Sequence, residues 1–110
     1  MKIHIDGNPK EVCCVAEGQR PERAKLDGTN TSNVAKYRAV LFGLYKHPEA
    51  TEVCSDSRLV IKQLNGEYTV KNERLEGLVD RIYRRWSQLG HEVKFTWIPK
   101  ENNLARKVLG

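Results

Sequence analysis

Two aspartates that lie far apart in the chain each come at the end of a segment with the pattern of a β-strand. Asp6 ends the segment 2–6, and Asp56 comes directly after the segment 51–55. Carboxylates are side chains that bind divalent cations and exchange protons in hydrolytic reactions. If the two segments are neighbouring parallel strands, their carboxyl ends lie at the edge where open α/β sheets bind ligands. The sequence therefore predicts that Asp6 and Asp56 converge at one site.

The elements that must position these aspartates follow from the periodicity of the apolar residues and from the turn and cap signals. These signals predict strands at 2–6, 11–16, 22–26, 51–55 and 92–97, and helices at about 34–47, 57–64, 71–89 and 104–109. The first three strands are joined by short turns, whereas the later strands are reached through helical crossovers, which build parallel pairs. We therefore expect an α/β fold with a five-stranded mixed sheet in the order 3-2-1-4-5, flanked by helices.

Length, charge and cysteine usage narrow the class of protein. The chain has 110 residues, a net charge of +5 and no apolar stretch near the roughly 20 residues that span a bilayer. We expect one domain over residues 1–110, and the charge weakly favours a polyanionic partner. The start of the chain has no signal-peptide pattern, and its three cysteines, Cys13, Cys14 and Cys54, are an odd number. We therefore expect reduced thiols in a cytoplasmic protein, with Cys13 and Cys14 on opposite faces of a strand.

Four segments carry a recognisable pattern in a fixed order: IHIDG at 3–7, TSNVAKYRA at 31–39, SDSRLV at 55–60 and WIPKENNLAR at 97–106. Together they resemble the motifs of the ribonuclease HI family. The resemblance covers nearly the whole chain and implies a ribonuclease H-like fold. It also implies a connection to RNA/DNA hybrids, whose RNA strand that family hydrolyses.

In the ribonuclease HI family, four carboxylates bind the two Mg²⁺ ions that activate water and stabilise the leaving oxygen. The resemblance places Asp6 at the first of these catalytic positions and Asp56 at the third. The second position, a glutamate in the family, falls on Lys36. The fourth, an aspartate, falls on Arg106, with the equally basic Lys107 as the alternative one residue further on. The resemblance therefore implies that two of the four catalytic positions are degenerate.

This replacement changes the charge of the predicted site. Asp6 and Asp56 contribute −2, and Lys36 with Arg106 contributes +2, so the site is neutral where the family's four carboxylates give about −4. We expect the two aspartates to form ion pairs, no metal cofactor to bind, and catalysis to be lost. The alternatives are an active ribonuclease HI with an altered Mg²⁺ site, for which Glu101 is poorly placed, and a protein-interaction scaffold, for instance a homodimer.

A nucleic-acid-binding surface can persist without catalysis. The family's minor-groove contacts correspond here to Ser32 and Asn33, at the start of the first helix, and to Arg58, two residues after Asp56. Lys36 and Arg106 would add positive charge on the path of the phosphates. We therefore predict that RNA/DNA hybrid or duplex RNA is the partner. The alternative for Ser32 is a helix cap, and for Arg58 a solvated side chain.

The long helix at 71–89 carries a group of basic residues: Lys71, Arg74, Arg81, Arg84 and Arg85. They could follow a phosphate backbone. The same helix also carries three acids: Glu73, Glu76 and Asp80. Because acids and bases share the helix, we favour a solvated face with salt bridges within it.

The two tryptophans lie beside apolar residues. Trp86 is close to Ile82 on the helical stripe, and Trp97 precedes Ile98. This context favours a place in the core for both tryptophans over stacking on nucleic-acid bases.

Overall fold

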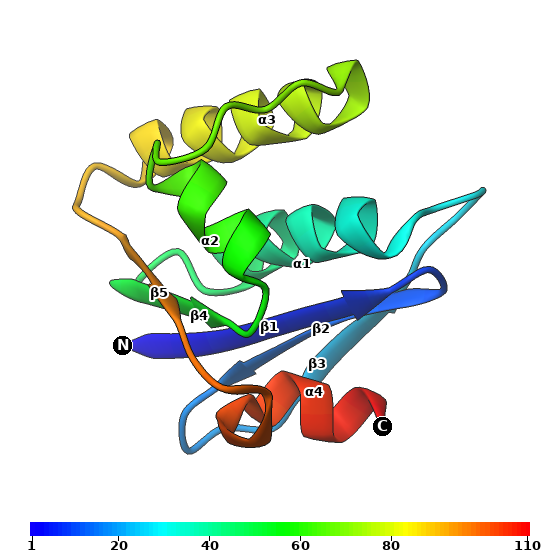
Figure 1. The fold of residues 1–110 in the computed structure, drawn as a ribbon. Helices are drawn as coiled ribbons and strands as arrows, with labels where there is room; N and C mark the ends of the chain where they lie inside the picture. The colour runs from blue at the N-terminus through cyan, green and yellow to red at the C-terminus, as the bar shows by residue number, and fades with distance from the viewer.

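A five-stranded mixed sheet lies at the centre of the structure, a computed structural model that describes residues 1–110 (Figure 1). The strands are β1 (Lys2–Asn8), β2 (Glu11–Ala16), β3 (Glu22–Lys25), β4 (Glu52–Ser55) and β5 (Lys94–Trp97). Their order is β3-β2-β1-β4-β5. The first three strands pair antiparallel, and β1, β4 and β5 are parallel neighbours. The fold class and strand order predicted from the sequence are thus confirmed.

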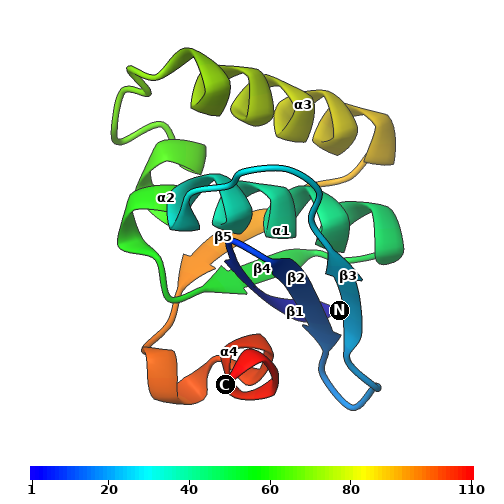
Figure 2. The same ribbon diagram turned by 90° about the vertical axis from the view of Figure 1, so that its right-hand side faces the viewer.

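The helices cover the two faces of the sheet unequally. They are α1 (Ser32–Lys46), α2 (Arg58–Leu64), α3 (Glu73–Leu89) and α4 (Leu104–Leu109), and a 3₁₀ turn at Lys100–Asn102 precedes α4. Figures 1 and 2 show α1 and α2 against one face with α3 outside them, while α4 alone covers the other face. No helix is both long enough and apolar enough to pass through a membrane.

The element boundaries differ from the predicted ones by one or two residues. The largest extension is in β1, which was expected to end at Asp6 but continues through Gly7 and Asn8, because these two residues pair with Val12 and Glu11 of β2. The long helix begins two residues later than predicted, since the side chain of Asn72 caps it. The extension of β1 matters for the site because it carries the backbone past Asp6 and against α1.

The main core fills the space between the sheet and α1, α2 and α3. Its large, fully buried side chains include Ile3, Ile5, Tyr37, Leu44 and Ile82. A smaller apolar cluster lies under α4 on the opposite face and contains Cys13, Val15 and Ala105. Cys14 belongs to the main core, so the two adjacent cysteines point to opposite faces, as the sequence predicts.

Candidate functional site

Asp6 of β1 forms an ion pair with Lys36 of α1. The Nζ atom of Lys36 donates to Oδ1 of Asp6 at 3.1 Å and to the carbonyl oxygen of Gly7 at 3.5 Å. Both side chains are largely removed from water, with exposed fractions of 7% for Asp6 and 20% for Lys36. A carboxylate in such an environment needs a compensating charge, which Lys36 supplies.

Gly7 makes this pairing possible because it lets β1 approach the backbone of α1. A Cβ atom at position 7 would lie 2.5 Å from the carbonyl oxygen of Ala35 and 2.8 Å from its carbonyl carbon. Only glycine fits at such a distance. The close approach places α1 so that Lys36, the residue after Ala35, reaches back to Asp6.

Asp56, directly after β4, forms the second ion pair. The Nη1 atom of Arg106, on α4, donates to Oδ2 of Asp56 at 3.1 Å. The Asp56 side chain is 9% exposed, whereas Arg106 is 45% exposed, so this pair is the more solvated of the two. The structure therefore places one of the two basic residues at the degenerate positions against each aspartate: Lys36 against Asp6, and Arg106 against Asp56.

Asn103 joins the two halves of the site and was not singled out from the sequence. Its fully buried Nδ2 atom donates to the carbonyl oxygen of Ile5, the residue before Asp6, at 3.1 Å and to Oδ1 of Asp56 at 3.0 Å. Its Oδ1 atom caps α4 by accepting from the backbone N–H groups of Ala105 and Arg106. The only signal in the sequence is an asparagine before a short helix, which predicts the cap but not the bridge between strands.

The donor set at this edge does not suit a pair of divalent cations. No group of three or more His, Cys, Asp or Glu side chains in the structure is arranged to hold a metal ion. The two carboxylates present each have a fixed cation on one oxygen, and Asp56 also accepts from an amide on the other. The formal charge of Asp6, Asp56, Lys36 and Arg106 sums to zero, so the Mg²⁺ ions of the ribonuclease HI family do not fit the residues present.

The start of α1 presents two polar side chains to solvent. Thr31 is the N-cap, and its Oγ1 atom accepts from the backbone N–H of Val34 at 3.1 Å. The alternative role of Ser32 as the cap is therefore wrong, and both Ser32 and Asn33 are exposed in the first turn. Since Lys36 follows Ser32 by four residues, the two side chains lie on the same side of α1.

Arg58 lies at the start of α2 and stacks on a tryptophan. Its guanidinium lies 4.4 Å from the centre of the Trp97 ring. The indole N–H of Trp97 donates to the carbonyl oxygen of Asp56 at 3.1 Å. Arg58, Trp97 and Lys62 line a hollow of about 270 Å³ beside Asp56. Arg58 is thus exposed but held in place, because the aromatic face restricts its guanidinium.

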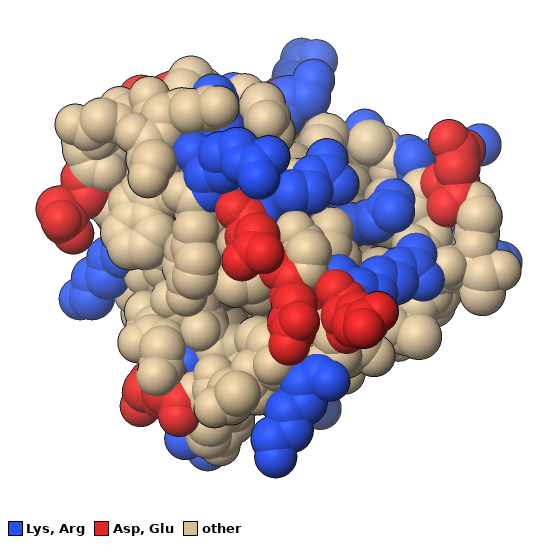
Figure 3. All heavy atoms as spheres, turned by 90° about the horizontal axis from the view of Figure 1, so that it is seen from above, with Lys and Arg blue, Asp and Glu red and all other residues tan.

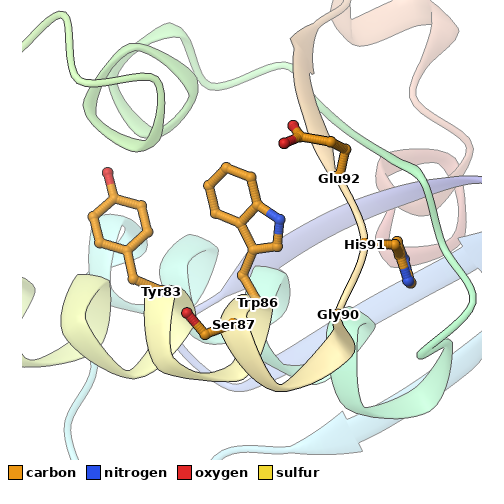
Figure 4. Close-up of a pocket in the computed structure, with 6 residues that line it drawn as sticks. All are labelled: Tyr83, Trp86, Ser87, Gly90, His91 and Glu92. Atoms are coloured by element: carbon orange, nitrogen blue, oxygen red, sulfur yellow. The ribbon is translucent and has the colours of Figure 1, made fainter.

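The prediction that both tryptophans lie in the core is wrong for Trp97, which is 37% exposed at the end of β5. Trp86 does pack against the core, with its ring 5.3 Å from that of Phe95. Figure 4 shows Trp86 in a hollow at the carboxyl end of α3, lined also by Tyr83, Ser87, Gly90, His91 and Glu92. Residues 90–92 precede β5, so this hollow lies at the opposite end of the strand from Trp97 and contains none of the predicted site residues.

The charged face of α3 is solvated, as predicted, but the salt bridges expected within it are absent. The ion pairs in the structure involve none of the acids or bases of this helix: Glu73, Arg74, Glu76, Asp80, Arg81, Arg84 and Arg85. Arg85 instead donates to the carbonyl oxygen of Leu44 at 3.4 Å and lies 4.3 Å from the centre of the Tyr45 ring. None of the basic residues of α3 therefore forms an ion pair with an acid.

The family follows from a match that covers nearly the whole chain. The model of a family described as reverse transcriptase-like matches residues 10–109, and the chain belongs to this family of ribonuclease H-like domains. Among solved structures, the N-terminal ribonuclease H domain of Rv2228c from Mycobacterium tuberculosis is 29% identical, with a TM-score of 0.79 over 93% of this chain and 84% of that one.

Two further structures support the same fold. LC11-RNase H1, solved in complex with an RNA/DNA hybrid, is 26% identical, with a TM-score of 0.80 and coverage of 99% of both chains. RNase H1 from Halobacterium salinarum has a TM-score of 0.83 at 20% identity, covering 98% of this chain and 92% of that one, which shows the fold alone.

The similarity to curated proteins covers only a part of their length. The bifunctional protein Rv2228c of Mycobacterium tuberculosis and the uncharacterized protein Mb2253c of Mycobacterium bovis are each 35% identical over 86 residues, which is 74% of this chain. The chain spans 23% of the length of either relative.

Proposed function

We propose that this ribonuclease H-like domain binds RNA/DNA hybrid or duplex RNA and does not cleave it. The observation that supports the proposal most strongly is the presence of two ion pairs, Lys36 with Asp6 and Arg106 with Asp56, each with a nitrogen–oxygen distance of 3.1 Å. They put fixed cations on the two carboxylates that the sequence resemblance assigns to catalysis.

The argument against cleavage is electrostatic. The family's four carboxylates contribute about −4 toward the total charge of +4 of two divalent ions. Here two carboxylates and two cations sum to zero. A fixed cation about 4 Å away opposes each unit of charge on an incoming metal by roughly 4 kcal/mol at an effective dielectric of 20. The repulsion doubles for a dication, so occupancy at millimolar Mg²⁺ is strongly disfavoured.

The argument for binding rests on what surrounds the ion pairs. Ser32 and Asn33 are exposed at the start of α1, and Arg58 is held on Trp97 beside Asp56. Short polar groups and an oriented guanidinium suit the 2′-hydroxyls and base edges in the wide minor groove of an A-like duplex. LC11-RNase H1, which has this fold over its full length, was solved with an RNA/DNA hybrid. The net charge of +5 favours association with any polyanion.

Fluorescence anisotropy with three duplexes of one sequence tests the binding. We expect RNA/DNA hybrid and duplex RNA to bind more tightly than duplex DNA, and log K to fall linearly with log salt. Arg58→Gln should weaken binding to the hybrid several-fold, while the matched control Arg20→Gln, in the turn between β2 and β3, should have a smaller effect. Absence of salt-dependent hybrid binding at 50 mM salt would refute the proposal and favour a protein-interaction scaffold.

A further inference from the structure

Three arginines surround a single shallow hollow between α1 and α3. Arg38 lines the hollow from α1, and Arg74 and Arg81 line it from α3. The hollow has a volume of about 250 Å³, and its remaining lining residues are Gly77 and Leu78. No acidic side chain lines it, and none of the three arginines forms an ion pair in the structure.

The separation of charge on α3 explains why acids do not fill this hollow. Arg74 and Arg81 are seven residues apart, about two turns, so they lie on the same flank of the helix. The acids Glu73, Glu76 and Asp80 fall on a different flank. Figure 3, which views the molecule from the α3 side, shows a run of blue side chains with red side chains directly next to it on one side.

Arg38 has an unsatisfied hydrogen-bond donor. Its Nε atom is buried and has no hydrogen-bond partner within the protein. A buried donor without an acceptor is unfavourable, and more so when the group is charged. An anion in the hollow would provide the missing acceptor.

Arg74 connects this hollow to the site at the end of β1. Its guanidinium donates to the carbonyl oxygen of Thr29 at 3.1 Å and to Oδ1 of Asn30 at 3.2 Å. These two residues come directly before Thr31, the cap of α1, and Asn30 is itself buried. The hollow thus adjoins the helix start that presents Ser32 and Asn33.

We propose that Arg38, Arg74 and Arg81 form a phosphate-binding site that holds a backbone phosphodiester of the nucleic acid whose groove lies against Ser32, Asn33 and Arg58. The guanidinium is the side chain best suited to this ligand, because its planar donors match the geometry of phosphate oxygens. The assignment to a nucleic-acid strand rests on the proposed function, since the hollow adjoins the same end of α1. The phosphate chemistry itself depends only on the three arginines.

The salt dependence of hybrid binding tests the site with a matched pair of variants. The test variant is Arg38→Gln with Arg81→Gln, which spares the contacts of Arg74 to the loop before α1. The control is Arg20→Gln with Arg84→Gln, which removes the same charge from arginines that do not line the hollow. Each lost phosphate contact should reduce the slope of log K against log salt by about 1, so the test variant should bind about 10- to 60-fold more weakly at 0.1 M salt.

A second readout uses inorganic pyrophosphate and no nucleic acid. In NMR spectra of the parent protein, millimolar pyrophosphate should shift the Nε–H signals of Arg38, Arg74 and Arg81, and the test variant should lose the response of Arg74. Equal salt slopes for the test and control variants, or no shift of these arginine signals, would overturn the site. If pyrophosphate binds but the parent protein does not bind hybrid, the phosphate site stands and the proposed function fails.

Discussion

Removal of the Lys36 ammonium should destabilise the protein far more than removal of the Arg106 guanidinium. Lys36→Met keeps the length of the side chain but leaves the Asp6 carboxylate, which is 7% exposed, without its cation. The structure gives the Asp6 carboxylate no hydrogen-bond donor other than Lys36. Breaking a buried ion pair from one side typically costs about 3–5 kcal/mol, because the remaining charge is uncompensated.

Arg106→Met should cost less than about 1 kcal/mol. Arg106 is 45% exposed, and solvent-exposed ion pairs contribute roughly 0.2–1 kcal/mol. Asp56 also keeps the amide of Asn103 as a donor at 3.0 Å. The two aspartates are almost equally buried and both ion pairs are 3.1 Å long, so the expected difference comes from the exposure of the cation that is removed and from the Asn103 amide that remains on Asp56.

Urea unfolding of a double-mutant cycle measures the difference. We expect Asp6→Asn with Lys36→Met to recover much of the loss caused by Lys36→Met alone, with a coupling energy of about 2 kcal/mol. The double variant also provides a foldable sample should Lys36→Met be too unstable to purify. A coupling energy below about 0.5 kcal/mol, or equal costs for Lys36→Met and Arg106→Met, would refute the view that Lys36 compensates a buried charge.

Three further predictions concern the site and the core. Lys36→Glu with Arg106→Asp changes the site charge from 0 to −4. The double variant should therefore bind Mg²⁺ in calorimetry, and its free energy of unfolding in EDTA should be lower than that of the parent protein. A double variant that is as stable as the parent in EDTA and does not bind Mg²⁺ would show that these residues share no site. In urea unfolding, Gly7→Ala should destabilise the protein by about 1–3 kcal/mol, because the new Cβ atom would clash with the carbonyl group of Ala35. Gly77→Ala is the control: no atom lies within 4 Å of the added Cβ, so this variant should be more stable by roughly 0.5–1 kcal/mol. Equal effects of the two substitutions would contradict the close approach of β1 to α1. Burial raises the pKa of all three cysteine thiols, so the native protein at pH 8 should react slowly with a disulfide reagent. The contribution of the neutral thiols to the free energy of unfolding should be fully present below about pH 9 and should be lost as the pH rises toward the folded-state pKa values. Fast labelling of the native protein at pH 8 would disprove this. The folded-state pKa values are about 11 for Cys13, about 12 for Cys14 and about 11 for Cys54.

The fold was predictable because local signals agree with the global topology. The β2 strand and α4 occupy the predicted residues, and short turns before helical crossovers led directly to the strand order. The placement of Asp6 and Asp56 at the same edge was expected from that order, since Asp6 lies just beyond the paired part of β1 and Asp56 directly follows β4, its parallel neighbour. The identity of their cationic partners came from the family resemblance, and the two ion pairs agree with it.

The features that sequence patterns missed depend on tertiary packing. Alternation places Phe95 and Trp97 on the same face of β5, but only Phe95 is covered by Trp86, and Trp97 lies at the strand end beneath Arg58. The bridge made by Asn103 joins segments almost a hundred residues apart, which no local signal can indicate. The spacing of Asp80 and Arg84, four residues apart on α3, permits a salt bridge, but the structure contains none on this helix, so sequence spacing alone does not determine the pairing.

The central claim, that the protein binds RNA/DNA hybrid without cleaving it, is tested most directly by a cleavage assay. Labelled hybrid is mixed with excess protein under conditions in which fluorescence anisotropy shows that the hybrid is bound. Product formation is followed in Mg²⁺ and in Mn²⁺, beside an active ribonuclease HI and the Lys36→Glu, Arg106→Asp variant. We expect the parent protein to hold the hybrid intact with either metal, because the cations on Asp6 and Asp56 exclude the metals. Metal-dependent cleavage of the RNA strand by the parent protein, abolished by Asp6→Asn, would contradict the account.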